Sequence, residues 1–235
     1  NITLSTSFES ISNCTFNGNN HTIANYTLSN KQYAGLLPNA IRVTVKNLTL
    51  KNANITAVND GSNNAYAGGF IGRAYGTNVV ENCTLENSIV QGINKVGGIA
   101  GFQAENGISI RKCTVKGSTI KVDTENQEYG QCGGILGYIG SVAAANEVSG
   151  NFIINTKVEA PANTNIGEEH RKSSICVGTL QGVKGQSLVI DMPFSYIQSS
   201  TFNGKTIDKT EYMGLLGGIR YEETQPSLTI NGTRF

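Results

Sequence analysis

The chain has 235 residues, a formal net charge of +1 and only 15% charged residues. This length allows one large all-β domain or two small domains. The near-zero charge argues against a nucleic-acid groove and a polybasic membrane patch, and no apolar run is long enough to span a membrane. We therefore expect neither a nucleic-acid partner nor a membrane-spanning segment in this chain.

Glycine-centred apolar runs recur along the sequence. They are YAGLL (33–37), YAGGFIG (66–72), KVGGIAG (95–101), QCGGILG (131–137), ICVGTLQ (175–181) and YMGLLGG (212–218). Gly97 follows Gly68 after 29 residues, and Gly133 follows Gly97 after 36. This imperfect period lies in the range of solenoid proteins.

A second pattern, apolar-x-x-apolar-x-apolar, falls between the glycine runs, as in Val80/Cys83/Leu85 and Ile110/Cys113/Val115. Inward residues of a strand are two apart, so a spacing of three shifts the alternation by one and predicts a bend. The first predicted corner holds Asn13, Asn47 and Asn82, and the second holds Gly18, Asn52, Asn87 and Gly117. Asn and Gly tolerate left-handed backbone angles. Each repeat therefore predicts three short strands separated by two bends.

Stacking such repeats places like residues above like. One predicted interior column holds Cys14, Leu48, Cys83 and Cys113, and another holds Ala34, Ala67, Val96, Cys132 and Met213. The cysteines then act as small buried hydrophobes. Their spacing fits neither a zinc site nor a disulfide framework, so we expect no metal and no cofactor.

The sequence predicts an all-β, single-stranded, right-handed parallel β-helix of six to seven coils. One domain is expected over 1–235, with regular coils over 8–140 and longer, less regular coils over 141–235.

The stretches GGFIGRAYGTNVVENCTLENSIVQG and GGIAGFQAENGISIRKCTVKGSTIKV resemble GLUG-type repeats. The likeness runs from about Cys14 to Tyr138, weakens over 143–209 and partly returns at TEYMGLLGG. The resemblance implies a β-helix of an exported bacterial protein attached to the cell surface, with its leader outside this sequence. Such proteins are common in gut Bacteroidetes and are described as adhesins or stalk modules. Some secreted IgA-type metallopeptidases carry these repeats outside their catalytic domain, so no catalytic residue is implied here.

An outward column of tyrosines is the predicted binding face. Tyr33, Tyr66 and Tyr212 each precede an inward residue, and Lys95, Gln131 and Ile175 are expected to fill the same column. Exposed aromatic rings can stack on sugars and anchor interfaces.

The leading hypothesis is a non-catalytic, secreted or cell-surface adhesin that presents a repetitive face to a glycan or a protein. One alternative is a carbohydrate-active lyase or hydrolase with a loop-built site near residues 160–172 and Asp191, for which the alignment predicts no acidic partner in its column. The other is a purely structural stalk of a larger surface protein.

Overall fold

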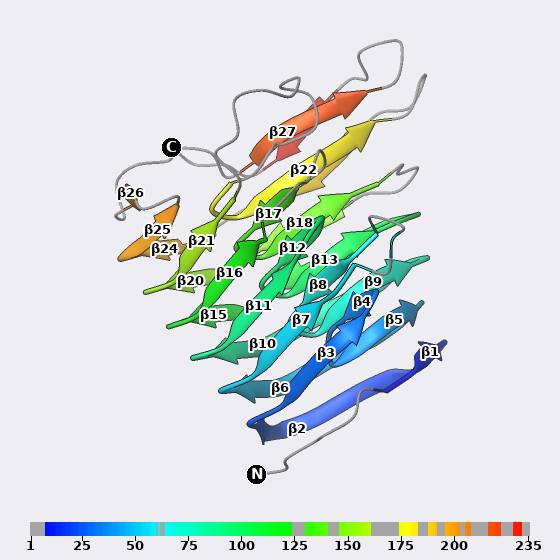
Figure 1. Cartoon of the computed structure of the whole chain (residues 1–235). Coiled ribbons are helices and arrows are strands. Elements are labelled where there is room, and N and C mark those ends of the chain that lie inside the picture. The colour runs from blue at the N-terminus through cyan, green and yellow to red at the C-terminus, as the bar shows by residue number, and fades with distance from the viewer. Residues whose placement is uncertain are drawn as a thin grey trace.

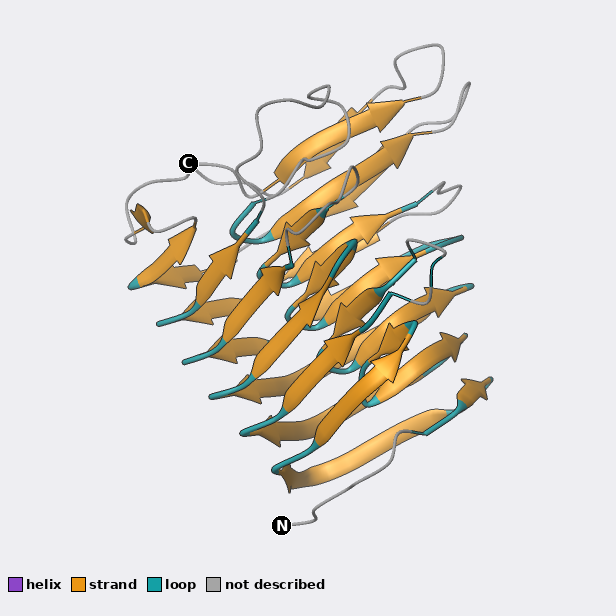
Figure 2. Ribbon diagram, viewed as in Figure 1, coloured by secondary structure: helices purple, strands orange, loops and turns teal. Residues whose placement is uncertain are grey.

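The computed structural model describes residues 8–59, 61, 64–123, 130–140, 146–160, 174–182, 188–191, 196–202, 205–207, 216–221 and 228–231. Within these ranges every regular element is a β-strand (Figure 2). The described part of the chain contains no helix of the length and apolarity that crossing a membrane requires.

The strands form four sheets. Sheet I contains β1 (Ser10–Ser12), β5 (Leu37–Ile41), β9 (Ile71–Tyr75), β13 (Ala100–Gln103), β18 (Leu136–Ile139), β22 (Val177–Gly182) and β27 (Leu216–Tyr221). Sheet II contains β2 (Thr15–Ala24), β6 (Thr44–Lys51), β10 (Asn78–Glu86), β14 (Ile108–Arg111), β15 (Thr114–Lys116), β19 (Asn146–Ser149), β20 (Phe152–Ile154), β23 (Leu188–Asp191), β24 (Tyr196–Gln198) and β28 (Leu228–Asn231). Sheet III contains β3 (Thr27–Lys31), β7 (Asn54–Ala57), β11 (Ile89–Gly92), β16 (Thr119–Val122), β21 (Lys157–Glu159), β25 (Ser200–Phe202) and β26 (Lys205–Ile207). Sheet IV contains β4 (Tyr33–Ala34), β8 (Tyr66–Gly68), β12 (Lys95–Gly97) and β17 (Gln131–Gly133).

The regular coils pass through sheets I, II, III and IV in that order, and the coils stack from blue β1 at one end to orange β27 at the other (Figure 1). The pairings between coils are parallel, as in β9 with β13 and β11 with β16. The predicted parallel β-helix is therefore confirmed, and the seven strands of sheet I match the predicted number of coils.

The predicted number of strands in a coil is wrong. The sequence predicted one wall for each glycine run, but the structure divides the run between sheet IV and sheet I, so a regular coil has four walls. The reason is a bend at the paired glycines. A Cβ at Gly97 would lie 2.0 Å from the carbonyl oxygen of Ala100, and a Cβ at Gly98 would lie 2.2 Å from that of Gly134 in the next coil. Only glycine allows backbones to approach this closely.

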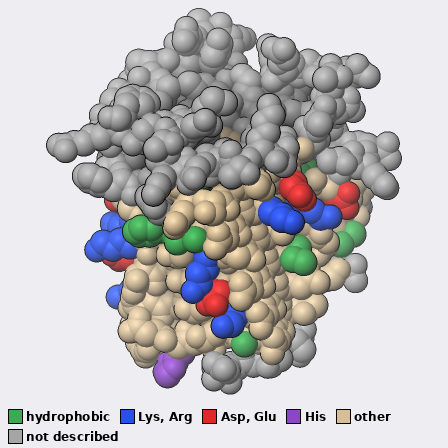
Figure 3. Space-filling model, turned by 90° about the vertical axis from the view of Figure 1, so that its left-hand side faces the viewer, with side chains coloured by type: hydrophobic (Ala, Val, Ile, Leu, Met, Phe, Trp, Pro, Cys, Tyr) green, Lys and Arg blue, Asp and Glu red, His purple; other side chains and the backbone are tan. Residues whose placement is uncertain are grey.

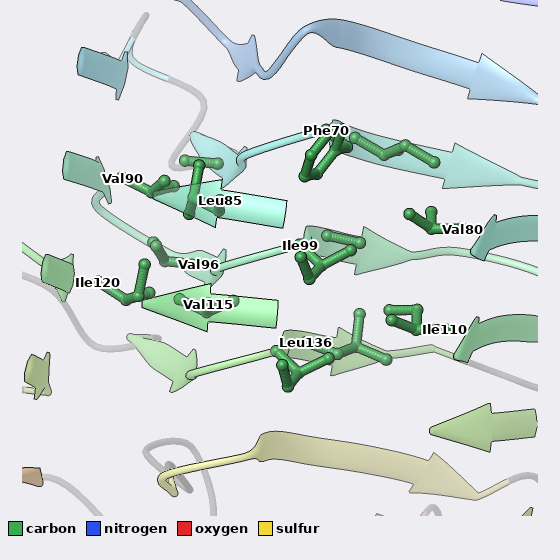
Figure 4. Close-up of a cluster of buried hydrophobic side chains, with 14 of the residues drawn as sticks. Phe70, Val80, Leu85, Val90, Val96, Ile99, Ile110, Val115, Ile120 and Leu136 are labelled. Atoms are coloured by element: carbon green, nitrogen blue, oxygen red, sulfur yellow. The ribbon is translucent and has the colours of Figure 1, made fainter. Parts of the chain in front are cut away.

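The interior is a single cluster of apolar side chains drawn from Ile23 to Val177. Figure 4 shows side chains of successive coils lying one above the other, namely Val80 and Ile110, Leu85 and Val115, Val90 and Ile120, and Phe70 and Ile99. The predicted column of Ala34, Ala67, Val96 and Cys132 is fully buried and in register, while Met213 lies outside the described residues. The extent of the domain, 1–235, stays a prediction.

The predicted cysteine column is correct for three of its four members. Leu48 pairs with Cys83, and the flanking register places Cys113 beside Cys83 in the next coil. Cys14 is exposed and does not belong to this column, because β2 pairs Thr15 with Thr44 and, after an irregularity between Asn17 and His21, pairs His21 with Leu48.

The same register corrects two predicted corner residues. Asn13 does adopt a positive φ of 52°, but it lies beside Arg42, whose φ is 53°, and not beside Asn47. Gly18 packs against Asn47 and Leu48 instead of joining the second corner. The first coil contains NCTF at residues 13–16, which resembles NCTL at residues 82–85. The predicted alignment of Cys14 with Cys83 came from this resemblance, whereas the strand pairing is different.

The second corner is otherwise as predicted and extends further. Its members all have a positive φ and lie beside one another in successive coils. They are Asn25, Asn52, Asn87, Gly117, Asn155 and Ser199. Buried hydroxyls follow this corner at Ser88, Ser118, Thr156 and Ser200. Ser88 Oγ accepts a 2.9 Å hydrogen bond from the Ala53 amide of the preceding coil and donates one of 2.8 Å to the Glu86 carbonyl. The hydroxyls therefore satisfy buried backbone groups where the chain turns.

Candidate functional site: an aromatic and cationic seam

Two columns of side chains from sheets IV and I meet beside the paired-glycine bend. The sheet IV column is the predicted one, in the order Tyr33, Tyr66, Lys95 and Gln131. The sheet I column runs Asn39, Arg73, Phe102 and Tyr138. We call the rings of Tyr33, Tyr66, Phe102 and Tyr138, with Arg73 and Lys95, the aromatic seam.

The four rings of the aromatic seam contact one another in series. Tyr33 and Tyr66 stack with centroids 5.3 Å apart and planes 22° apart. Tyr66 meets Phe102 edge-on at 4.9 Å, and Phe102 meets Tyr138 edge-on at 5.6 Å. Such ring pairs contribute about 0.5–1.5 kcal/mol each beyond the burial of their area. The seam is thus a packed cluster separate from the main core.

Two cations lie over these rings. Lys95 Nζ is 4.6 Å from the ring centroid of Tyr66, 5.1 Å from that of Phe102 and 4.9 Å from that of Tyr138. Arg73 Cζ is 5.2 Å from the centroid of Tyr33 and 5.0 Å from that of Tyr75. These distances are within the range of cation–π attraction, which fixes both cations against the aromatic surface.

Hydrogen bonds hold the hydroxyl ends of the tyrosines. Tyr66 Oη donates to Asn64 Oδ1 at 2.6 Å, and Tyr75 Oη donates to Glu105 Oε1 at 2.7 Å. Arg73 Nη1 donates a long bond of 3.4 Å to Tyr33 Oη. Burial, with smaller contributions from Tyr33 and Tyr138, raises the pKa of Tyr66 to about 12, and Arg73 opposes this shift.

Exposure differs along the seam. Tyr33, Arg73, Lys95 and Phe102 are partly exposed, whereas Tyr66 is 6% exposed. The expectation that Tyr66 presents its ring to solvent is therefore wrong, because Phe102 and Lys95 cover it. Its role in ligand binding stays a prediction.

Tyr212 and Ile175 were also predicted to lie in this column. Tyr212 lies outside the described residues. Ile175 is not in the column, because its carbonyl accepts the Gly134 amide and its side chain is only 1% exposed. The bridge between Gly133 and Ser174 and the pairing of Leu136 with Val177 shift the run by three positions relative to the prediction, which placed Ile175 beside Gln131.

Sequence reasoning missed the sheet I half of the seam. Arg73, Phe102 and Tyr138 each follow the last glycine of a Gly-Gly-x-x-Gly run, so their shared position was visible in the sequence. What the sequence did not show is that the bend turns this position towards the tyrosine column.

Only some of the residues predicted for the enzymatic alternative lie within the described ranges. Residues 161–173 lie outside the described residues. Asp191 pairs in register with Glu147, so the expectation that no acidic residue shares its column is wrong. Burial raises the pKa of Glu147, but hydrogen bonds from Ser149 and Ser109 and the nearby Arg111 outweigh it and leave the pKa lowered. Glu147 is thus held ionised, 3.5 Å from Arg111 Nη1.

The family model "the GLUG motif" matches residues 63–90. The chain carries a GLUG motif. In the structure this motif spans β8, β9 and β10 and reaches into β11, and so supplies nearly one coil, including Tyr66, the paired glycines and Arg73.

Other comparisons add little to the GLUG motif. No curated protein matches the chain. A solved structure from Bacteroides ovatus, provisionally named an immunoglobulin A1 protease, superposes with a TM-score of 0.48 and 18% sequence identity, covering 92% of this chain and 68% of that one. A likeness of this degree does not carry the neighbour's activity to this chain.

Proposed function

We propose that this chain is a non-catalytic binding module of a secreted or cell-surface protein, and that it presents the aromatic seam to a glycan. The observation that carries the proposal is the seam itself. Aromatic rings and cations from successive coils form a continuous, partly exposed cluster outside the core. Rings combined with a few polar groups are what protein surfaces use to hold sugars and partner chains.

The GLUG motif supports the proposed location. It occurs in parallel β-helix proteins, and the resemblance of the repeats implies an exported protein of the cell surface. A solenoid supports such a role physically, because each coil adds the same faces at a fixed spacing and so extends a binding surface along its length.

The lowered pKa values of two described carboxylates, Glu86 and Glu147, support a non-catalytic role. A general acid in a glycosidase needs a raised pKa. A hydrogen bond from Lys51 instead lowers the pKa of Glu86 against the opposing effect of burial, a bond from Lys116 adds to the lowering, and the pKa of Glu147 is also lowered. Figure 3 shows one face on which red and blue side chains lie next to each other in small groups on a mostly tan surface. Ion pairs between oppositely charged side chains, such as Glu86 with Lys51, join neighbouring coils.

The test is a glycan-array binding screen of the purified chain, repeated with Tyr33→Ala. Phe152→Ala is the matched control, because Phe152 is an aromatic residue on sheet II that is 42% exposed. We expect saturable binding that Tyr33→Ala weakens at least about tenfold and Phe152→Ala leaves unchanged. Thermal unfolding of each variant confirms that the coils remain folded.

Other outcomes separate the alternatives. Loss of binding in Phe152→Ala alone would move the binding face to sheet II. An array without any hit would favour the stalk. Release of new reducing ends or unsaturated uronates from a polysaccharide would favour the enzyme.

A further inference from the structure

We infer that the ligand of the seam is an acidic glycan, and that a sugar carboxylate binds the guanidinium of Arg73. This inference rests on the proposed function and names the chemical class of its ligand. The decisive feature is an arginine that is fixed in place, partly exposed and not paired with an acid.

Arg73 is held by aromatic rings and not by carboxylates. Its Cζ lies 5.2 Å from the ring centroid of Tyr33 and 5.0 Å from that of Tyr75. Among the described residues, ion pairs join Lys51, Arg111, Lys112 and Lys116 to glutamates, whereas none involves Arg73. Arg73 is therefore a described arginine that aromatic rings hold in place without a paired carboxylate.

The hydrogen-bonding capacity of Arg73 is mostly unused. Its Nη1 makes the 3.4 Å bond to Tyr33 Oη, and its buried Nε has no partner in the described part of the chain. Asn39, the register neighbour of Arg73, likewise has a buried Oδ1 without a partner. A guanidinium offers five donors in a planar fork. The N–H donors of this partly exposed guanidinium that have no partner in the described part of the chain are suited to bind both oxygens of a carboxylate.

The contacts of Tyr33 favour an anion over a stacked neutral sugar at this end of the seam. A sugar stacked on Tyr33 would need a free face of that ring, but Tyr33 is already stacked on Tyr66 and lies under Arg73. Around Tyr33 the seam offers positive charge and the Tyr33 hydroxyl. Lys95 adds a second cation over Tyr66 in the neighbouring coil. A carboxylate on Arg73 therefore uses the groups that ring packing leaves available.

Among the described residues, the carboxylate joined to this end of the seam is that of Glu105, which is exposed and accepts a hydrogen bond from the Tyr75 hydroxyl. That bond raises the pKa of Tyr75 and keeps Glu105 directed at the phenol. Glu105 thus fixes the ring that holds Arg73, and the ligand's carboxylate supplies the charge that Arg73 lacks.

The experiment is calorimetric titration of the full chain with two carboxylated sugars, an oligogalacturonate and a sialyl-oligosaccharide, and with a carboxyl-reduced, neutral form of each. These two acids share the chemistry but represent plant and animal sources. We expect one of the acidic sugars to bind at least about tenfold more tightly than its reduced form, with affinity that falls as salt rises.

The variants identify the residue. Arg73→Lys keeps the charge but loses the planar fork, and should weaken binding about tenfold. Arg73→Gln should abolish it. Lys46→Gln removes one positive charge from sheet II, where Lys46 is partly exposed, and should leave the affinity unchanged.

Equal affinity for acidic and reduced sugars, or an unchanged affinity in Arg73→Lys, would overturn this inference. The proposed function would survive both results, because glycan binding would remain. Absence of binding to every sugar here and on the array would overturn the proposed function together with the inference.

Discussion

Gly98→Ala tests whether backbone contact between coils is what requires glycine at the paired-glycine bend. Gly98 has no positive φ, so its backbone conformation is open to alanine. The new Cβ would nevertheless lie 2.2 Å from Gly134 O and 3.0 Å from Val115 Cγ2. The oxygen belongs to the backbone of the next coil and cannot rotate away.

The size of the effect follows from what must move. The two coils would have to separate by roughly 1 Å to reach an ordinary contact. The bend is closed by hydrogen bonds from Gly98 N to Gly133 O at 3.3 Å and from Ile99 N to Ile135 O at 2.9 Å. Losing two such bonds at about 1 kcal/mol each, with an overpacking cost of similar size, outweighs the entropic gain of alanine, about 0.4–1 kcal/mol. We expect a net loss of about 2–3 kcal/mol in the free energy of unfolding.

The assay is equilibrium unfolding in urea followed by far-ultraviolet circular dichroism. Gly150→Asn is the matched control, because Gly150 has a φ of 59°, its Cβ would meet nothing closer than 3.9 Å, and its register column holds Asn82 with a φ of 51°. This variant should change stability by less than about 0.5 kcal/mol. A Gly98→Ala chain as stable as the wild type would refute the argument from close approach.

Three further predictions concern single residues. Ser88→Ala leaves the buried Ala53 amide without its acceptor and should cost about 1–3 kcal/mol, with faster hydrogen exchange at Ala53; unchanged exchange would contradict the proposed role of the hydroxyl. A thiol reagent should modify one cysteine, Cys14, quickly in the native chain and all five in denaturant, because the other four are buried; rapid reaction of a second thiol would contradict the packing. The raised pKa of Tyr66, about 12, means that the unfolded chain loses this proton first, so the stability contributed is complete below pH 10 and lost as pH rises towards 12. Tyr66→Phe should flatten the fall in the unfolding midpoint over this range, and an unchanged slope would show that Tyr66 is not the group responsible.

The sequence alone determined the solenoid and most of its corners. Asn52, Asn87 and Gly117 were predicted to turn with left-handed backbone angles, and their φ values are 52°, 49° and 59°. These features are local, because a slip in the alternation and a residue that tolerates positive φ both leave their mark within a few positions. The same local pattern led to the wrong prediction that Cys14 lies in the core. The first coil has the corner sequence of later coils, but its strand pairs with the next coil in a different register.

Only the tertiary structure decided which outward residues are exposed and what they meet. Tyr33 and Tyr66 occupy the same outward column, but one is partly exposed and the other is covered. The difference comes from Phe102, which reaches Tyr66 from sheet I across the bend at the paired glycines, and from Lys95, which covers Tyr66 from the next coil of sheet IV. Alternation along a strand tells which face a side chain takes, whereas the surroundings of that face depend on the angle between two sheets and on residues one coil away.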